Sequence, residues 1–183
     1  MRPFLHDRLR RQESLLASST EAMRAFTTLD LALDQVVVAF LDEAGAVYAA
    51  IGAPEAENET LSLKAQFTSA RSGVNPLTLE RVTQRRREME RTIALHALTV
   101  SADRLRTGCA EARATLAAAR EQLVPLVAYG FQKGLVPDGE LGQAELERVW
   151  RTLSEDPQIR PVARQIALSL HPADILLLLG DLL

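Results

Sequence analysis

The fold is decided by one long stretch, Pro76–Val124, which reads PLTLERVTQRRREMERTIALHALTVSADRLRTGCAEARATLAAAREQLV. Asn75 precedes it, and Asn-Pro is a typical helix start because Asn caps free N–H groups and Pro fits the first helical position. The stretch holds one glycine, Gly108, and the next proline, Pro125, is expected to kink or end the helix. The sequence therefore predicts a helix over 76–124, about 73 Å long at 1.5 Å per residue.

Two apolar stripes follow 3–4 spacing along this helix and point in nearly opposite directions. The first stripe contains Val82, Met89, Ile93, His96 and Val100. The second contains Leu95, Leu98, Ala102, Leu105, Cys109, Ala112, Leu116, Ala119 and Leu123. They overlap between residues 93 and 100, where a helix apolar almost all round is expected to be buried on both sides. Either the helix is continuous and its halves pack against different layers, or it breaks near 99–101.

The fold class that follows is all-α. We expect an elongated helical bundle around one long central helix, either continuous or kinked, with a smaller C-terminal helical cluster. Hydrophobic residues make up 47% of the 183 residues and aromatic residues only 4%, which favours close-packed helices over a β-sandwich. We place the bundle in residues 1–134 and the C-terminal cluster of short helices, packed on the same core, in residues 135–183.

The segment before the long helix is open to two interpretations. Ser18 and Glu21 have capping-box spacing, which predicts a second helix that runs as far as Gly52-Ala53-Pro54. Alternatively, Val36–Ile51 forms a β-hairpin, which is common in small-ligand sensor domains. No third strand is apparent to cover such a hairpin. A further helix is predicted from Thr60 to Ser72, ended by Gly73. Beyond Pro125, any helical continuation over 126–133 is expected to end at Gly134.

A run of arginines is the nearest approach to a nucleic-acid signal. Its members are Arg81, Arg85, Arg86, Arg87 and Arg91. Basic clusters supply affinity for phosphates, so a nucleic-acid-binding helical protein is one alternative function. These arginines spread around most of the helix, however, and glutamates are interleaved with them. A solvated, salt-bridged helix surface is the simpler interpretation.

The function favoured by the sequence is that of a non-catalytic protein-interaction module: an adaptor, chaperone-like or regulatory protein that self-associates as a dimer. The doubly apolar centre of the long helix and the leucine-rich C-terminus lead to this prediction, because neither is expected to face water. The predicted partner interface contains Met89, Ile93, His96, Val100, Leu176 and Leu179.

Composition argues against other classes of function. The net charge of −3 provides no long-range attraction to nucleic acid or acidic membranes. The three histidines are far apart and form no metal motif, and no nucleotide-binding loop is present, so we expect no metal, cofactor or catalytic residue. A single cysteine fits a reducing compartment, and the longest apolar run is too short to span a bilayer. We therefore expect a cytoplasmic protein without a membrane segment.

Overall fold

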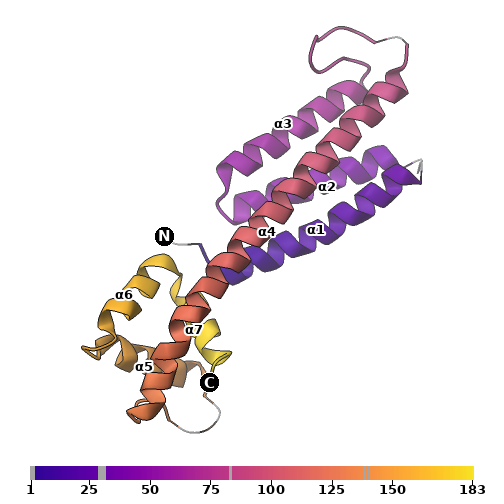
Figure 1. Ribbon diagram of the computed structural model, residues 1–183. Helices are drawn as coiled ribbons and strands as arrows, with labels where there is room; N and C mark the ends of the chain where they lie inside the picture. Colours follow the sequence, from indigo (N-terminus) through magenta and orange to yellow (C-terminus); the bar gives the residue numbers. More distant parts are fainter. Residues whose placement is uncertain (1–2, 29–31, 83, 138, 140) are drawn as a thin grey trace. The chain divides into compact units, whose positions relative to one another are not determined.

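The computed structural model describes residues 3–28, 32–82, 84–137, 139 and 141–183. Within them the chain forms seven helices and no β-sheet, which confirms the predicted all-α class (Figure 1). The helices are α1 (Leu5–Thr27), α2 (Leu33–Ala50), α3 (Pro54–Arg71), α4 (Arg86–Gln132), α5 (Gln143–Glu155), α6 (Arg160–Ser169) and α7 (Pro172–Gly180).

The helices divide into two compact units. Unit 1 consists of Met1–Leu9 and Ala110–Leu183, and unit 2 consists of Arg10–Cys109. The division therefore falls inside α4, not near residue 134 where the sequence placed it. The reason is the packing of the second half of α4, whose Leu116, Leu123 and Val127 lie in one buried cluster with Ile166 and Ile175 of the C-terminal helices.

Unit 2 is a bundle of four helices: most of α1, then α2, α3 and the first part of α4 (Figure 1). Every helix contributes to its core, as Leu15, Phe40, Phe67 and Leu98 show. The buried residues of α2 recur every three or four positions, namely Val37, Phe40, Leu41, Ala44 and Tyr48. The hairpin interpretation of 36–51 is therefore wrong, because the burial follows a helical period along one continuous helix.

The predicted helix start at Ser18 is also wrong, because α1 continues through it to Thr27. The hydroxyls of this segment hydrogen-bond backwards along the helix: Ser19 Oγ donates to the carbonyl of Leu16 at 2.7 Å, and Thr20 Oγ1 donates to the same carbonyl at 3.2 Å. Serine and threonine can thus occupy a helix interior by bonding to a preceding turn. A capping-box spacing alone does not distinguish this use from a true cap.

Three helices end at the glycines that the sequence indicated. Gly52, Gly73 and Gly134 have φ values of 66°, 77° and 64°, in the left-handed region. After α4, the Leu135 N–H donates to the Gly130 carbonyl and the Gly134 N–H donates to the Phe131 carbonyl, which is the Schellman pattern. Helix α3 begins earlier than predicted because Pro54 occupies its first turn.

Both ends of the long helix differ from the prediction. The side chain of Asn75 does accept hydrogen bonds from the Leu77 and Thr78 N–H groups, as a helix cap would. These bonds form a turn within a loop, however, and α4 begins only at Arg86. At the other end α4 runs through Pro125 to Gln132. Pro125 removes the N–H that would bond to the Glu121 carbonyl, and both residues are exposed, so water can satisfy that carbonyl. Buried neighbours on the opposite face hold the helix together.

Unit 1 contains a buried carboxylate that joins the beginning and end of its sequence. Asp174, in the first turn of α7, is completely buried. Its Oδ2 accepts a hydrogen bond from the Leu5 N–H and its Oδ1 accepts one from the His6 N–H, each at 2.9 Å. Nδ1 of His6 lies 2.6 Å from the same Oδ1. Asp174 therefore satisfies the free N–H groups at the start of α1 from 168 residues or more away.

Tyr129 gives unit 1 a titratable probe. Its hydroxyl donates a hydrogen bond to the Asp156 carboxylate at 3.2 Å. Burial, then this hydrogen bond and the carboxylate charge raise the pKa of the Tyr129 phenol above its ordinary value. Because the raised pKa favours the protonated form in the folded state, the contribution to stability is present below about pH 10 and is lost as the pH rises through the raised pKa.

We expect the absorbance of ionised tyrosine, measured against pH, to show a transition at a higher pH than that of free tyrosine. Tyr129→Phe should remove this transition. Asp156→Asn should move that transition towards the ordinary value, because it removes the carboxylate charge. A Tyr129 transition at or below that of free tyrosine would contradict the assignment.

Candidate functional site

The α3–α4 loop, residues 72–85, carries the most unusual backbone in unit 2. The Asn75 N–H donates to the Glu80 carbonyl and the Val82 N–H donates to the Gly73 carbonyl, so Val74 and Arg81 form an isolated antiparallel bridge. Leu79 and Arg85 have φ values of 60° and 59°. This conformation costs free energy for residues other than glycine, and it persists where surrounding hydrogen bonds impose it. Residues 73–82 of the loop are thus held in a defined conformation by their own hydrogen bonds.

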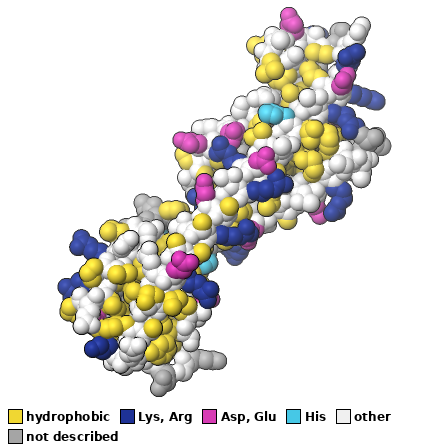
Figure 2. Space-filling view, viewed as in Figure 1, with side chains coloured by type: hydrophobic (Ala, Val, Ile, Leu, Met, Phe, Trp, Pro, Cys, Tyr) yellow, Lys and Arg dark blue, Asp and Glu magenta, His cyan; other side chains and the backbone are white. Residues whose placement is uncertain are grey.

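This loop exposes two leucines. Leu77 is 82% exposed and Leu79 is 77% exposed, the highest values among the large hydrophobic residues that the structure describes. Figure 2 shows hydrophobic side chains at the top of the view, where this loop lies, with basic and acidic side chains beside them. Exposed leucines next to one another in an ordered loop are typical of a binding surface.

A groove of about 450 Å³ lies between the loop and the start of α4. We call it the loop groove, and its lining consists of Asn75, Pro76, Leu77, Val82, Gln84, Arg85, Glu88, Met89, Thr92 and Ile93. Met89 and Ile93 belong to the predicted partner interface, and the structure brings them together here. The apolar stripe that the sequence indicated on the long helix is therefore accessible at its first turns, where it meets Leu77 of the loop.

The other predicted interface residues on α4 lie elsewhere. Val100 is half-buried against the core of unit 2, whereas His96 is exposed and its neighbour Leu95 is 41% exposed. Ala94 and Leu98 are buried. The prediction that the helix is buried on both sides near residue 96 is thus not met within one chain, because His96 of the first stripe and Leu95 face solvent.

The arginine run is largely occupied by contacts within the chain. Arg85 lies 3.8 Å from Glu88, Arg86 donates to the Arg71 carbonyl, and Arg91 stacks over the Phe26 ring at 5.1 Å. Arg81 and Arg87 are exposed, and no hydrogen bond or ion pair in the described residues engages their side chains. The five arginines thus reduce to two whose side chains are available to a partner. Arg81 follows Leu79 by two positions in the loop, and Arg87 lies in the first turn of α4.

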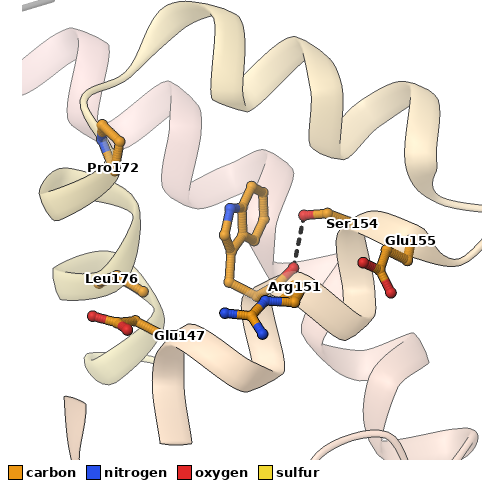
Figure 3. A pocket seen from close by; sticks show the side chains of 7 residues that line it. Glu147, Arg151, Ser154, Glu155, Pro172 and Leu176 are labelled. Carbon is orange, nitrogen blue, oxygen red and sulfur yellow. Dashed lines mark hydrogen bonds between the residues drawn. The ribbon is translucent and has the colours of Figure 1, made fainter. Parts of the chain in front are cut away.

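A second groove lies in unit 1, between α5 and α7. We call it the α5–α7 groove; its volume is about 440 Å³ and its lining consists of Glu147, Trp150, Arg151, Ser154, Glu155, Pro172 and Leu176. Figure 3 shows Glu147, Arg151 and Glu155 on α5, with Pro172 and Leu176 across the groove on α7. Leu176 therefore lines an accessible surface. Leu179, its companion in the predicted interface, is fully buried in the core of unit 1 and is not available to a partner.

Little in the described residues points to chemistry. They contain no group of three metal-ligating side chains, and Cys109 is buried. No single described helix is both long and apolar enough to cross a membrane; α6 and α7 would suffice only together, and they meet at a bend of 117°. Comparison of the chain with protein-family models, curated proteins and solved structures gave no match.

The sequence missed the exposed leucines, Leu77 and Leu79, because it placed both in a helix. A signal was present: an Asn-Pro pair followed by Thr78 favours a turn as well as a helix start. The α5–α7 groove had no such signal, since it depends on two helices meeting that are separated by α6 in the chain.

Proposed function

We propose that this chain is a non-catalytic protein-interaction module that binds an apolar segment of a partner protein through Leu77, Leu79 and the loop groove. The single observation that carries the proposal is the exposure of both leucines in a loop held by its own hydrogen bonds. Covering a leucine side chain stabilises a complex by about 1.5–3 kcal/mol. An ordered loop also loses little conformational entropy when it binds, so more of that free energy remains as affinity.

The other two functions that the sequence suggested receive less support. A small-ligand sensor required the hairpin over 36–51, and α2 is a helix there. Nucleic-acid binding draws on many phosphate contacts, because each neutralised phosphate adds to the affinity. Within the described residues, only Arg81 and Arg87 of the arginine run have side chains that no hydrogen bond, ion pair or ring contact engages. A cytoplasmic location is part of our proposal, supported by the single buried cysteine.

Photo-crosslinking tests this proposal. A photoreactive phenylalanine analogue is introduced in place of Leu77 in the native host, and in place of Leu61 as the control. Leu61 is 53% exposed on α3 of the same unit but lies outside the loop groove. We expect discrete protein adducts at position 77 that are missing at position 61.

The protein found in the adduct is then purified and its affinity measured. Leu79→Ser should weaken binding at least tenfold, because the buried apolar area of one leucine is lost, while Leu61→Ser should leave the affinity unchanged. The same adducts at both positions, or an affinity insensitive to Leu79→Ser, would rule out the loop as the binding surface.

A further inference from the structure

We infer that the partner of the α3–α4 loop is a second copy of this chain, and that the loop of one copy inserts Leu77 and Leu79 into the α5–α7 groove of the next. This inference rests on the proposed function of the loop and names its occupant. The surface that projects and the surface that receives it are present on the same polypeptide, in unit 2 and unit 1 respectively.

The apolar parts of the two surfaces match. The α5–α7 groove has an apolar wall formed by Trp150, Pro172 and Leu176, and Trp150 remains partly exposed in its lining. A volume of about 440 Å³ lies in the range of ~300–1,000 Å³ typical of pockets that enclose a small ligand. Two leucine side chains are small enough to enter it. Tryptophan is also among the residues that most often dominate the affinity of a protein interface.

The charges of the two surfaces are complementary. The α5–α7 groove presents Glu147 and Glu155, both exposed, on either side of Arg151 along α5 (Figure 3). The loop presents the exposed Glu80 and Arg81, and the exposed Arg87 lies in the first turn of α4 directly after it; no hydrogen bond or ion pair of the described residues engages the side chains of these two arginines. Two acids and one base on the groove thus match two bases and one acid on the loop and the first turn of α4. Complementary rim charges favour the correct pairing and suppress others.

Each copy carries both a loop and a groove, so the contact joins two different surfaces. Two copies that exchange loops form a closed two-fold dimer, the state expected from the sequence, whereas copies that bind different neighbours form a ring or a growing chain. In every case the assembled fraction should increase with protein concentration.

Two charge-reversed variants of the full chain test this arrangement by sedimentation velocity over a range of concentrations. The loop variant is Arg81→Glu with Arg87→Glu, and the groove variant is Glu147→Arg with Glu155→Arg. We expect the wild-type chain to assemble, and each variant alone to assemble at least tenfold more weakly. The control, Arg120→Glu with Arg164→Glu, makes the same charge change as the loop variant at exposed positions of unit 1 and should assemble like the wild type.

Mixing the two variants separates the interface from a folding defect. The reversed loop of one variant meets the reversed groove of the other, and the two unchanged surfaces also meet, so an equimolar mixture should recover assembly. A wild-type chain that stays monomeric at all concentrations, or a mixture that does not recover, overturns the inference. In either case crosslinks from position 77 to another protein would leave the proposed function standing.

Discussion

Replacing Asp174 with alanine should lower the free energy of unfolding of unit 1 by roughly 3–5 kcal/mol. The carboxylate is fully buried and accepts hydrogen bonds from two backbone N–H groups at the start of α1, besides its contact with the His6 ring. The alanine variant leaves all of these polar groups without that acceptor in a place where Leu5 is also buried. Each unsatisfied buried group costs about 1–3 kcal/mol.

The location of Asp174 in α7 strengthens this expectation. Its carboxylate lies in the first turn of α7, after the His171 cap, where the helix dipole favours negative charge. The same charge lies against the first turn of α1, where the dipole acts in the same sense. One side chain thus compensates the unsatisfied N-termini of two helices, and its loss affects both.

The measurement is denaturant unfolding followed by tryptophan fluorescence. Trp150 is the single tryptophan and lies in unit 1, so its emission reports on the unit that contains Asp174. Glu145→Ala is the matched control: Glu145 lies in the same unit and pairs with the exposed Arg148 on the surface, so this change should cost less than about 1 kcal/mol. An Asp174→Ala variant as stable as that control would show that the buried carboxylate does not hold α1.

Local features of the fold were predictable from sequence because their causes are local. Gly52, Gly73 and Gly134 end helices since a left-handed residue is needed there, and glycine adopts it without strain. The all-α class follows from the 3.6-residue period of the apolar positions, which the burial along α2 confirms.

The errors come from signals whose meaning depends on distant contacts. Asn75 caps a turn in either a helix or a loop, and the bridge between Val74 and Arg81 decides which. Pro125 is tolerated because it lies on an exposed face, where water can hydrogen-bond to the carbonyl that the missing N–H leaves without a donor. No spacing in the sequence joins Asp174 to Leu5, because the hydrogen bond spans 169 residues. The candidate site depends on the same kind of contact, which is why the predicted interface contained Met89 and Ile93 but neither Leu77 nor Leu79.

The second large effect is expected from Gly130→Ala, which should destabilise unit 1 by about 1–3 kcal/mol. Gly130 is a helical residue near the end of α4, and its carbonyl accepts the Leu135 N–H that closes the helix. A methyl group there would lie 2.8 Å from Val136 Cγ2 and 2.9 Å from Leu153 Cδ2. Val136 and Leu153 are both buried in one small cluster, so neither can move aside without disturbing the packing of α5.

Gly45→Ala provides the opposite result in the same chain. Gly45 lies inside α2, and a methyl group added there would meet no atom within 4 Å. Alanine favours a helix interior over glycine by about 0.5–1 kcal/mol, so this variant should be more stable than the wild type. Circular dichroism in denaturant compares the two variants, with Trp150 fluorescence assigning the Gly130→Ala loss to unit 1. If both substitutions stabilise the chain, helix propensity outweighs packing at residue 130, and the tight closure of α4 over Val136 and Leu153 is refuted.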